Sequence, residues 1–124
     1  MKLYRNGFYT GFHREEFACR CGCGFDTVDT ELLDVLIDIK ERFNFAPVII
    51  NSGCRCEIHN KAVGGAIAST HLKGVAVDAV VVGVDASDVF SYLDGKYEDK
   101  YGIGKYLNRT HIDVRQNKAR WEVK

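Results

Sequence analysis

The chain has 124 residues, of which 46% are hydrophobic and 27% charged, and its formal net charge at neutral pH is zero. This length predicts one domain, residues 1–124, with a substantial core. The charge balance argues against a nucleic-acid partner, and no stretch approaches the roughly 20 apolar residues needed for membrane insertion. Residues 1–7 lack the apolar core of a signal peptide, so we expect cytoplasmic synthesis without one.

Hydrophobic periodicity predicts an α+β domain. Asp29 is a good helix N-cap, and apolar residues recur at helical spacing from Leu32 to Phe43. Residues 48–50 and 77–82 are predicted to be buried strands, with a second helix after Asp85. The remaining expectations are a wrapping amino-terminal segment with a helical turn near 14–17, a brief helix at 58–63, a strand at 101–106, a hairpin into the strand of His111, and an edge strand at 119–123. Helices would thus flank a small, largely antiparallel sheet.

Five cysteines form two groups, Cys19, Cys21 and Cys23 in one and Cys54 and Cys56 in the other. The odd count means that they cannot all pair, and the Cys-x-Cys spacing differs from the Cys-x-x-Cys of a zinc ribbon. Three states remain open: reduced thiols packed as small hydrophobic groups, a disulfide between the two groups, or a structural metal held by both.

The stretch Ser69-Thr70-His71-Leu72-Lys73-Gly74-Val75-Ala76-Val77-Asp78 brings a histidine and a carboxylate close together in sequence. Asp78 begins a strand predicted to be buried, where an unpaired carboxylate is costly. One zinc ion shared with His71 would neutralise it, and His111 could supply a third ligand, leaving an open fourth position as in catalytic zinc sites. The alternative is that His71 hydrogen-bonds Asp78 while His111 faces solvent.

Three further residues are candidates for a role in such a site. Asp113, two residues after His111 on a strand, should share its face, which suggests a catalytic base, a partner that orients His111 or His59, or a solvated surface carboxylate. Arg55 follows a predicted strand end, where its guanidinium could grip a substrate carboxylate or make a surface salt bridge. His59 could contact substrate or be satisfied by backbone groups.

Several motifs, in order from about Phe17 to Trp121, resemble the zinc D-alanyl-D-alanine carboxypeptidase family. That family includes cell-wall peptidases, phage L-alanyl-D-glutamate endolysins, vancomycin-resistance dipeptidases and, in fold, the hedgehog signalling domain. The motifs are Ser52-Gly53-Cys54-Arg55, His59-Asn60, Val63-Gly64-Gly65-Ala66, Ser69-x-His71-x-x-Gly74-x-Ala76-x-Asp78 and His111-x-Asp113-Val114-Arg115.

The resemblance implies one zinc ion held by His71, Asp78 and His111, with the predicted substrate-binding residues Arg55, Ser69 and His59 nearby. It implies hydrolysis of a peptide bond in peptidoglycan stem peptides. The small size, the single domain and the missing signal peptide suggest a phage or prophage product that acts at the wall after release or in the virion, and we expect a monomer. Relatives place an acidic base at the position of Asn108, or a histidine at that of Arg109; Asp113 therefore takes the role of catalytic base by default. The alternative is a non-catalytic module of the same fold that binds wall peptide or protein.

Overall fold

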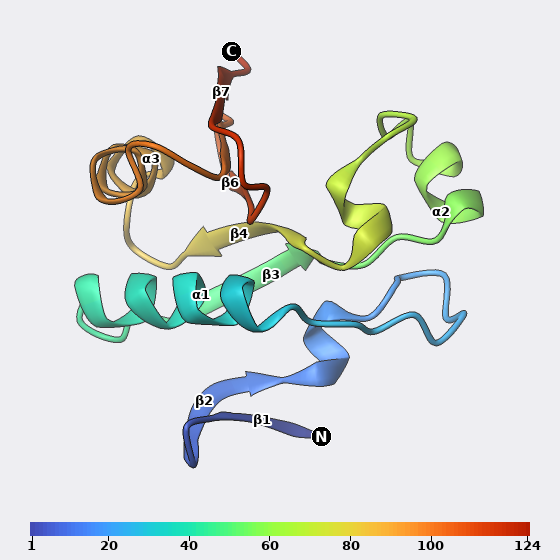
Figure 1. Cartoon of the computed structure of the whole chain (residues 1–124), viewed down its shortest axis with the longest axis horizontal. Coiled ribbons are helices and arrows are strands. Elements are labelled where there is room, and N and C mark those ends of the chain that lie inside the picture. Colours follow the sequence, from blue (N-terminus) through green and yellow to red (C-terminus); the bar gives the residue numbers. More distant parts are fainter.

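Five strands form the central sheet of the computed structural model, which describes residues 1–124 (Figure 1). Neighbouring strands from β3 to β5 are antiparallel, and only the edge strand β7 runs parallel to its neighbour, β5. The prediction of an α+β fold with a largely antiparallel sheet is therefore confirmed. In spatial order the strands are β3 (Val48–Ser52), β4 (Ala76–Val81), β6 (Thr110–Asp113), β5 (Gly102–Lys105) and β7 (Ala119–Glu122).

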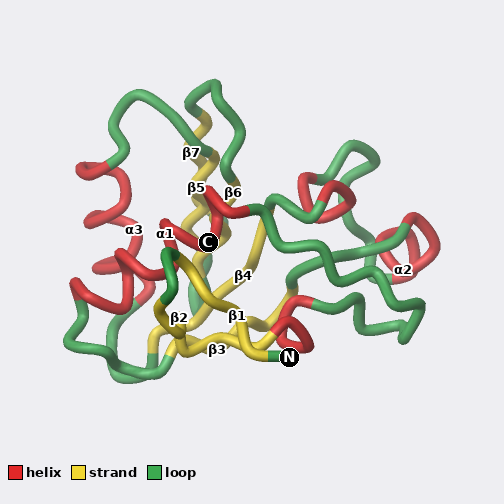
Figure 2. The backbone as a smooth tube through the Cα atoms, turned by 60° about the horizontal axis from the view of Figure 1, so that its bottom comes forward, coloured by secondary structure: helices red, strands yellow, loops and turns green.

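Three α-helices accompany the sheet, with α2 and α3 at opposite ends of the molecule in both ribbon views (Figures 1 and 2). Asp29 caps α1 as predicted, since its carboxylate accepts hydrogen bonds from the backbone N–H groups of Glu31 and Leu32. No helix is long and apolar enough to span a membrane. The helices are α1 (Thr30–Arg42), α2 (Glu57–Ala62) and α3 (Ala86–Lys96), and two 3-10 turns are η1 (Arg14–Phe17) and η2 (Thr70–Lys73).

The amino-terminal segment contains a hairpin that was not predicted from the sequence. Strands β1 (Lys2–Arg5) and β2 (Phe8–His13) pair antiparallel in a separate two-stranded sheet, and the predicted helical turn follows as η1. The residues between the strands, Asn6 and Gly7, both have positive φ, at 53° and 82°. An Asn-Gly pair is typical of two-residue hairpin turns, so this dipeptide was the signal that could have predicted the hairpin.

The two faces of the central sheet differ in character. The register partners Val77, Ile103 and Ile112 on β4, β5 and β6 are buried in the hydrophobic core, which also contains apolar residues of α1 and α3. Successive side chains of a strand point to opposite faces. Asp78 and His111, which are also register partners, therefore project from the other face. The strand alternation thus separates a hydrophobic face from a polar one at the centre of the sheet.

Two glycines of β5 make room for side chains on the polar face. A Cβ atom at Gly104 would lie 2.3 Å from the indole Nε1 of Trp121, and one at Gly102 would lie 2.3 Å from Oδ2 of Asp113. Gly104 is the register partner of His111. Any larger residue at these two positions would push Trp121 or Asp113 away from the centre of the sheet.

Candidate metal centre

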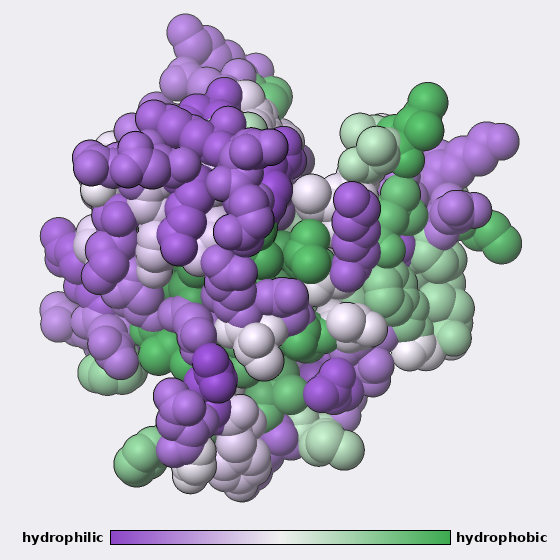
Figure 3. All heavy atoms as spheres, in the orientation of Figure 1, coloured by the Kyte–Doolittle hydropathy of each residue, from purple (hydrophilic) through white to green (hydrophobic).

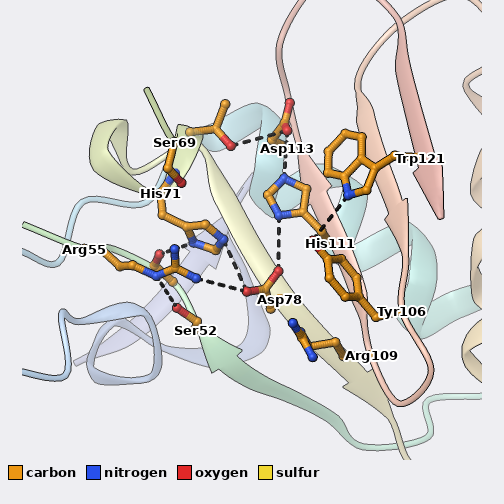
Figure 4. Close-up of polar contacts among 12 residues, drawn as sticks. Ser52, Arg55, Ser69, His71, Asp78, Tyr106, Arg109, His111, Asp113 and Trp121 are labelled. Atoms are coloured by element: carbon orange, nitrogen blue, oxygen red, sulfur yellow. Dashed lines mark hydrogen bonds and ion pairs between the residues drawn. The ribbon is translucent and has the colours of Figure 1, made fainter. Parts of the chain in front are cut away.

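Two histidines and one aspartate converge on the polar face of the sheet (Figure 4). Asp78 lies on β4 opposite His111 of β6, and His71 lies in η2, shortly before β4. His71 Nε2 is 3.3 Å from Asp78 Oδ2, and His111 Nδ1 is 3.1 Å from Asp78 Oδ1. All three side chains are buried, so the alternative of a solvent-facing His111 is wrong. The structure therefore brings together the three residues predicted as metal ligands.

The other ring nitrogen of each histidine is held by an oxygen acceptor. His71 Nδ1 lies 2.6 Å from the backbone oxygen of Gly53, and His111 Nε2 lies 2.8 Å from Oδ2 of Asp113. These oxygens only accept hydrogen bonds, so each of these nitrogens carries a proton. If an imidazole is neutral, its nitrogen facing Asp78 then carries a lone pair and no proton. Because the Asp78 carboxylate is also an acceptor, two acceptors would face each other. These contacts become favourable only with a positive charge at the centre, either an extra proton or a metal ion.

Burial and the close contacts between charged groups shift the pKa values of Asp78 and His111. Burial raises the pKa of the Asp78 carboxyl, but hydrogen bonds and charge interactions with His111 and His71 lower it by more, so that it lies well below its ordinary range. Burial lowers the pKa of His111, but contacts with Asp113 and Asp78 outweigh this effect and raise it. Asp78 is therefore ionised at neutral pH, as a metal ligand must be.

Asp113 is fully buried, and both of its carboxylate oxygens form hydrogen bonds with other side chains of the protein. Its Oδ1 accepts a hydrogen bond from Arg115 Nε at 2.7 Å, and its Oδ2 contacts Arg115 Nη2 at 2.8 Å and Thr70 Oγ1 at 3.3 Å, beside the bond to His111. Burial raises the pKa of Asp113, but the bonds from His111 and Arg115 bring it well below its ordinary range. The alternative of a solvated surface Asp113 is therefore wrong.

Arg55 is engaged by three neighbours within the protein. Its Nη2 lies 3.3 Å from Asp78 Oδ2, its Nη1 donates to Asn60 Oδ1 at 3.1 Å, and its Nε donates to Ser52 Oγ at 3.2 Å. Asn60 in turn donates a hydrogen bond to the backbone oxygen of Ala66. Arg55 thus connects the Asp78 carboxylate to the loop that follows α2, and it also lines the cleft described below.

The other two residues predicted to bind substrate differ in position. Ser69 caps η2, where its hydroxyl accepts a hydrogen bond from the backbone N–H of His71, and it lines the cleft. His59 lies on α2 and is not among the cleft-lining residues. The structure therefore brings Ser69 to the site but not His59.

A cleft of about 440 Å³ opens over His71, Asp78 and His111. One wall is formed by the segment from Val63 to His71 and the other by residues from the end of β5 to β7. Figure 3 shows the surface hollowed between these two parts of the molecule. Four residues of the second wall were not predicted from the sequence to belong to the site: Tyr106, Arg109, Arg115 and Trp121.

These four residues form a connected group. Arg109 lies 4.1 Å above the ring of Tyr106, whose hydroxyl accepts a hydrogen bond from Trp121 Nε1 at 3.3 Å. The ring centroid of Trp121 lies 5.0 Å from that of His111. Arg109 and Arg115 lie close in sequence to His111, and this closeness could have indicated that they belong to the site. No sequence pattern indicated Trp121, because it reaches the site only through the pairing of β7 with β5.

A protein-family model described as peptidase M15 matches residues 10–113. The chain belongs to the peptidase M15 family. The resemblance to zinc D-alanyl-D-alanine carboxypeptidases is thereby confirmed. Comparisons with curated proteins and with solved structures found no match.

The donor atoms fit the zinc ion on which M15 peptidases depend. A tetrahedral zinc ion with nitrogen and oxygen ligands at about 2.0–2.1 Å keeps its ligand atoms roughly 3.3 Å apart. The contacts of His71 and His111 with Asp78, at 3.3 and 3.1 Å, are close to this value. Zinc would be held by His71 Nε2, His111 Nδ1 and the Asp78 carboxylate, while Gly53 and Asp113 fix the two imidazole tautomers.

Removal of either histidine should remove this zinc. In His71→Ala or His111→Ala, the remaining two ligands cannot satisfy a tetrahedral ion, so elemental analysis of protein purified without added metal should show the loss of one zinc per chain. His13→Ala is the control, because His13 is exposed on β2 and should change nothing. Full zinc retention in both of the first two variants would contradict the assignment.

Proposed function

We propose that the protein hydrolyses a peptide bond in peptidoglycan stem peptides with a zinc ion bound by His71, Asp78 and His111. The observation that carries the proposal is the pair of imidazole nitrogens aimed at one buried carboxylate on the floor of a cleft, in a chain of the M15 family. The reaction would be of the D-Ala-D-Ala carboxypeptidase or the L-Ala-D-Glu endopeptidase type.

When bound by His71, Asp78 and His111, a zinc ion would polarise the scissile carbonyl and lower the pKa of a bound water. The protein itself supplies two imidazoles whose orientation is set from behind, by hydrogen bonds to Gly53 and Asp113. Asp78 supplies the negative charge that makes cation binding favourable in a buried site. The walls of the cleft supply hydroxyl groups, guanidinium groups and an indole for contact with a peptide.

Arg109 is our candidate for the residue that grips a substrate carboxylate. Of the three arginines lining the cleft, Arg55 pairs with Asp78 and Arg115 pairs with Asp113, whereas Arg109 forms no ion pair with a carboxylate of the protein. Its guanidinium is positioned by stacking on Tyr106 and retains donors for a ligand. Arg55, with its three internal contacts, would instead hold Asp78 and the cleft wall in place.

We further propose that Asp113 orients His111 and is not the catalytic base. Its oxygens are engaged by His111, Arg115 and Thr70, and the side chain is fully buried. A base must reach the proton of the attacking water directly or through another water. Asp113 instead holds the outer nitrogen of His111, the role that carboxylates commonly play behind metal-bound histidines.

One observation favours a second function, binding of a wall peptide or a protein without hydrolysis. Apart from Asp78, no residue lining the cleft carries a carboxylate, and Asn108, where relatives place an acidic base, is exposed outside the cleft. A chain that retained the metal and the cleft but lacked a base would still recognise its ligand.

Incubation with purified stem peptides separates these two functions. Hydrolysis predicts release of D-Ala, or cleavage at the L-Ala-D-Glu bond, that is abolished by a chelator and restored by zinc. Zinc-dependent binding of the same peptides without any cleavage would instead support the binding module. We expect the first result, and we propose that the protein acts at the cell wall, either after release from the cell or as a virion component.

Asp113→Asn should weaken zinc binding by about 10- to 100-fold, because an amide holds the imidazole of His111 less firmly than a carboxylate. Competition with a chelating dye measures the affinity. Added zinc should then recover much of the peptidase rate. A kcat lowered by roughly 10² to 10⁴ at saturating zinc, with unchanged zinc affinity, would instead identify Asp113 as the base.

Arg109→Ala should lower kcat/KM on stem peptide by roughly 10² while zinc content and thermal stability remain unchanged, since the lost contact is a charge-assisted one. Arg109→Lys should restore only part of the activity, because an ammonium group cannot bind a carboxylate in two places. Arg42→Ala is a matched control, since Arg42 also stacks on aromatic rings but lies on α1, outside the cleft. An equal loss in the control would refute the role.

A further inference from the structure

Four cysteine sulfurs meet at a second place in the molecule, outside the cleft. Cys19, Cys21 and Cys23 come from the loop after η1, and Cys56 comes from the residue just before α2. Their sulfur atoms all lie within 4.8 Å of one another. Two segments that are more than thirty residues apart in the chain therefore bring four thiols to one point.

The spacing of these sulfurs matches that around a single metal ion. The Sγ of Cys19 lies 3.5 Å from that of Cys21 and 3.9 Å from that of Cys56, and the sulfurs of Cys21 and Cys56 are 3.6 Å apart. A tetrahedral zinc ion with sulfur ligands at about 2.3 Å keeps them roughly 3.8 Å apart. None of the five cysteines forms a disulfide in the structure.

The loop that carries three of these cysteines is folded around the cluster. Gly22 and Gly24 have φ values of 83° and 92°, in the left-handed region that glycine readily adopts. The backbone N–H of Cys19 donates to the oxygen of Phe25 at 2.8 Å, which closes the loop. These turns allow cysteines at alternate positions to face a common centre.

Backbone N–H groups are directed at two of the sulfurs. The N–H of Cys56 lies 3.4 Å from the Sγ of Cys19, and the N–H of His59 lies 3.4 Å from the Sγ of Cys56. Such donors stabilise thiolates, the form in which cysteine binds a metal. Cys21 and Cys23 are exposed, which is unusual for thiols that serve only as small hydrophobic groups in a core.

Cys54 differs from the other four cysteines. It is buried, and its thiol donates a hydrogen bond to the backbone oxygen of Thr27 at 3.0 Å, away from the cluster. The five cysteines thus consist of a cluster of four and one separate buried residue, Cys54. The set of four is complete for a tetrahedral ion with no position left for water, as in structural zinc sites.

We propose that Cys19, Cys21, Cys23 and Cys56 bind a structural zinc ion, distinct from the one at His71, Asp78 and His111. The ion joins the amino-terminal loop to the turn before α2. Arg55 immediately precedes Cys56, and its backbone N–H donates to the oxygen of His71. The second zinc therefore holds in place the segment that carries Arg55 and leads to one wall of the cleft.

Metal analysis of the 124-residue chain tests this inference. Protein purified without added metal should contain two zinc ions per chain, and both Cys21→Ser and Cys56→Ser should contain one. Cys54→Ala is the matched control and should retain both, because its sulfur lies outside the cluster. His71→Ala should lose only the other ion, so failure of the cleft site and failure of the cysteine site give different results.

Two measurements that need no cysteine variant keep the test decisive if such a variant fails to fold. A thiol reagent should react slowly with the clustered cysteines Cys19, Cys21, Cys23 and Cys56, and quickly with the same four after a chelator is added. Cobalt substitution should give an intense thiolate-to-cobalt charge-transfer absorption, and this should persist in His71→Ala. One zinc per chain with Cys21 and Cys23 freely reactive, or a disulfide between the two cysteine groups, would overturn the proposal.

Discussion

The buried carboxylate of Asp78, facing two imidazoles at the centre of the sheet, is the constraint on which the site depends. A buried charge is costly unless it is paired and hydrogen-bonded. Here β4 and β6 pair in the register that places Asp78 opposite His111, and η2 brings in His71. The remaining polar partner is Arg55, from the turn after β3. Four segments of the chain thus meet because one charge must be satisfied.

The residues that contact the outer side of His111 also form a continuous hydrogen-bond network. Asp113 is held by Arg115 and Thr70, and it in turn holds His111. No buried polar side-chain atom in the structure lacks a hydrogen-bond partner. A network that is satisfied in this way fixes side-chain orientation, which a metal site needs more than it needs additional stability.

The two proposed zinc sites have different chemistry. The cleft site offers two nitrogens and a carboxylate, with one position left for water or substrate, whereas the cysteine site offers four sulfurs and leaves none. Arg55 connects the two sites, because its side chain contacts Asp78 and the next residue in the chain, Cys56, belongs to the sulfur cluster. With the proposed second zinc bound, the loop from Cys19 to Gly24 would help to set the geometry of the cleft, although no residue of that loop lines it.

The sequence by itself determined α1 and the strands β3 and β4, because helical periodicity and strand composition are local patterns. It also predicted His71, Asp78 and His111 as zinc ligands, through their motifs and the resemblance to a zinc peptidase family, and the tertiary structure brings these three side chains together. Only the tertiary structure decided that Asp113 is buried behind His111, that Arg55 is engaged by its neighbours, and that Trp121 lines the cleft. It also decided that Cys56 joins the three earlier cysteines. These features depend on strand pairing and loop packing between segments far apart in the chain, which local patterns do not encode.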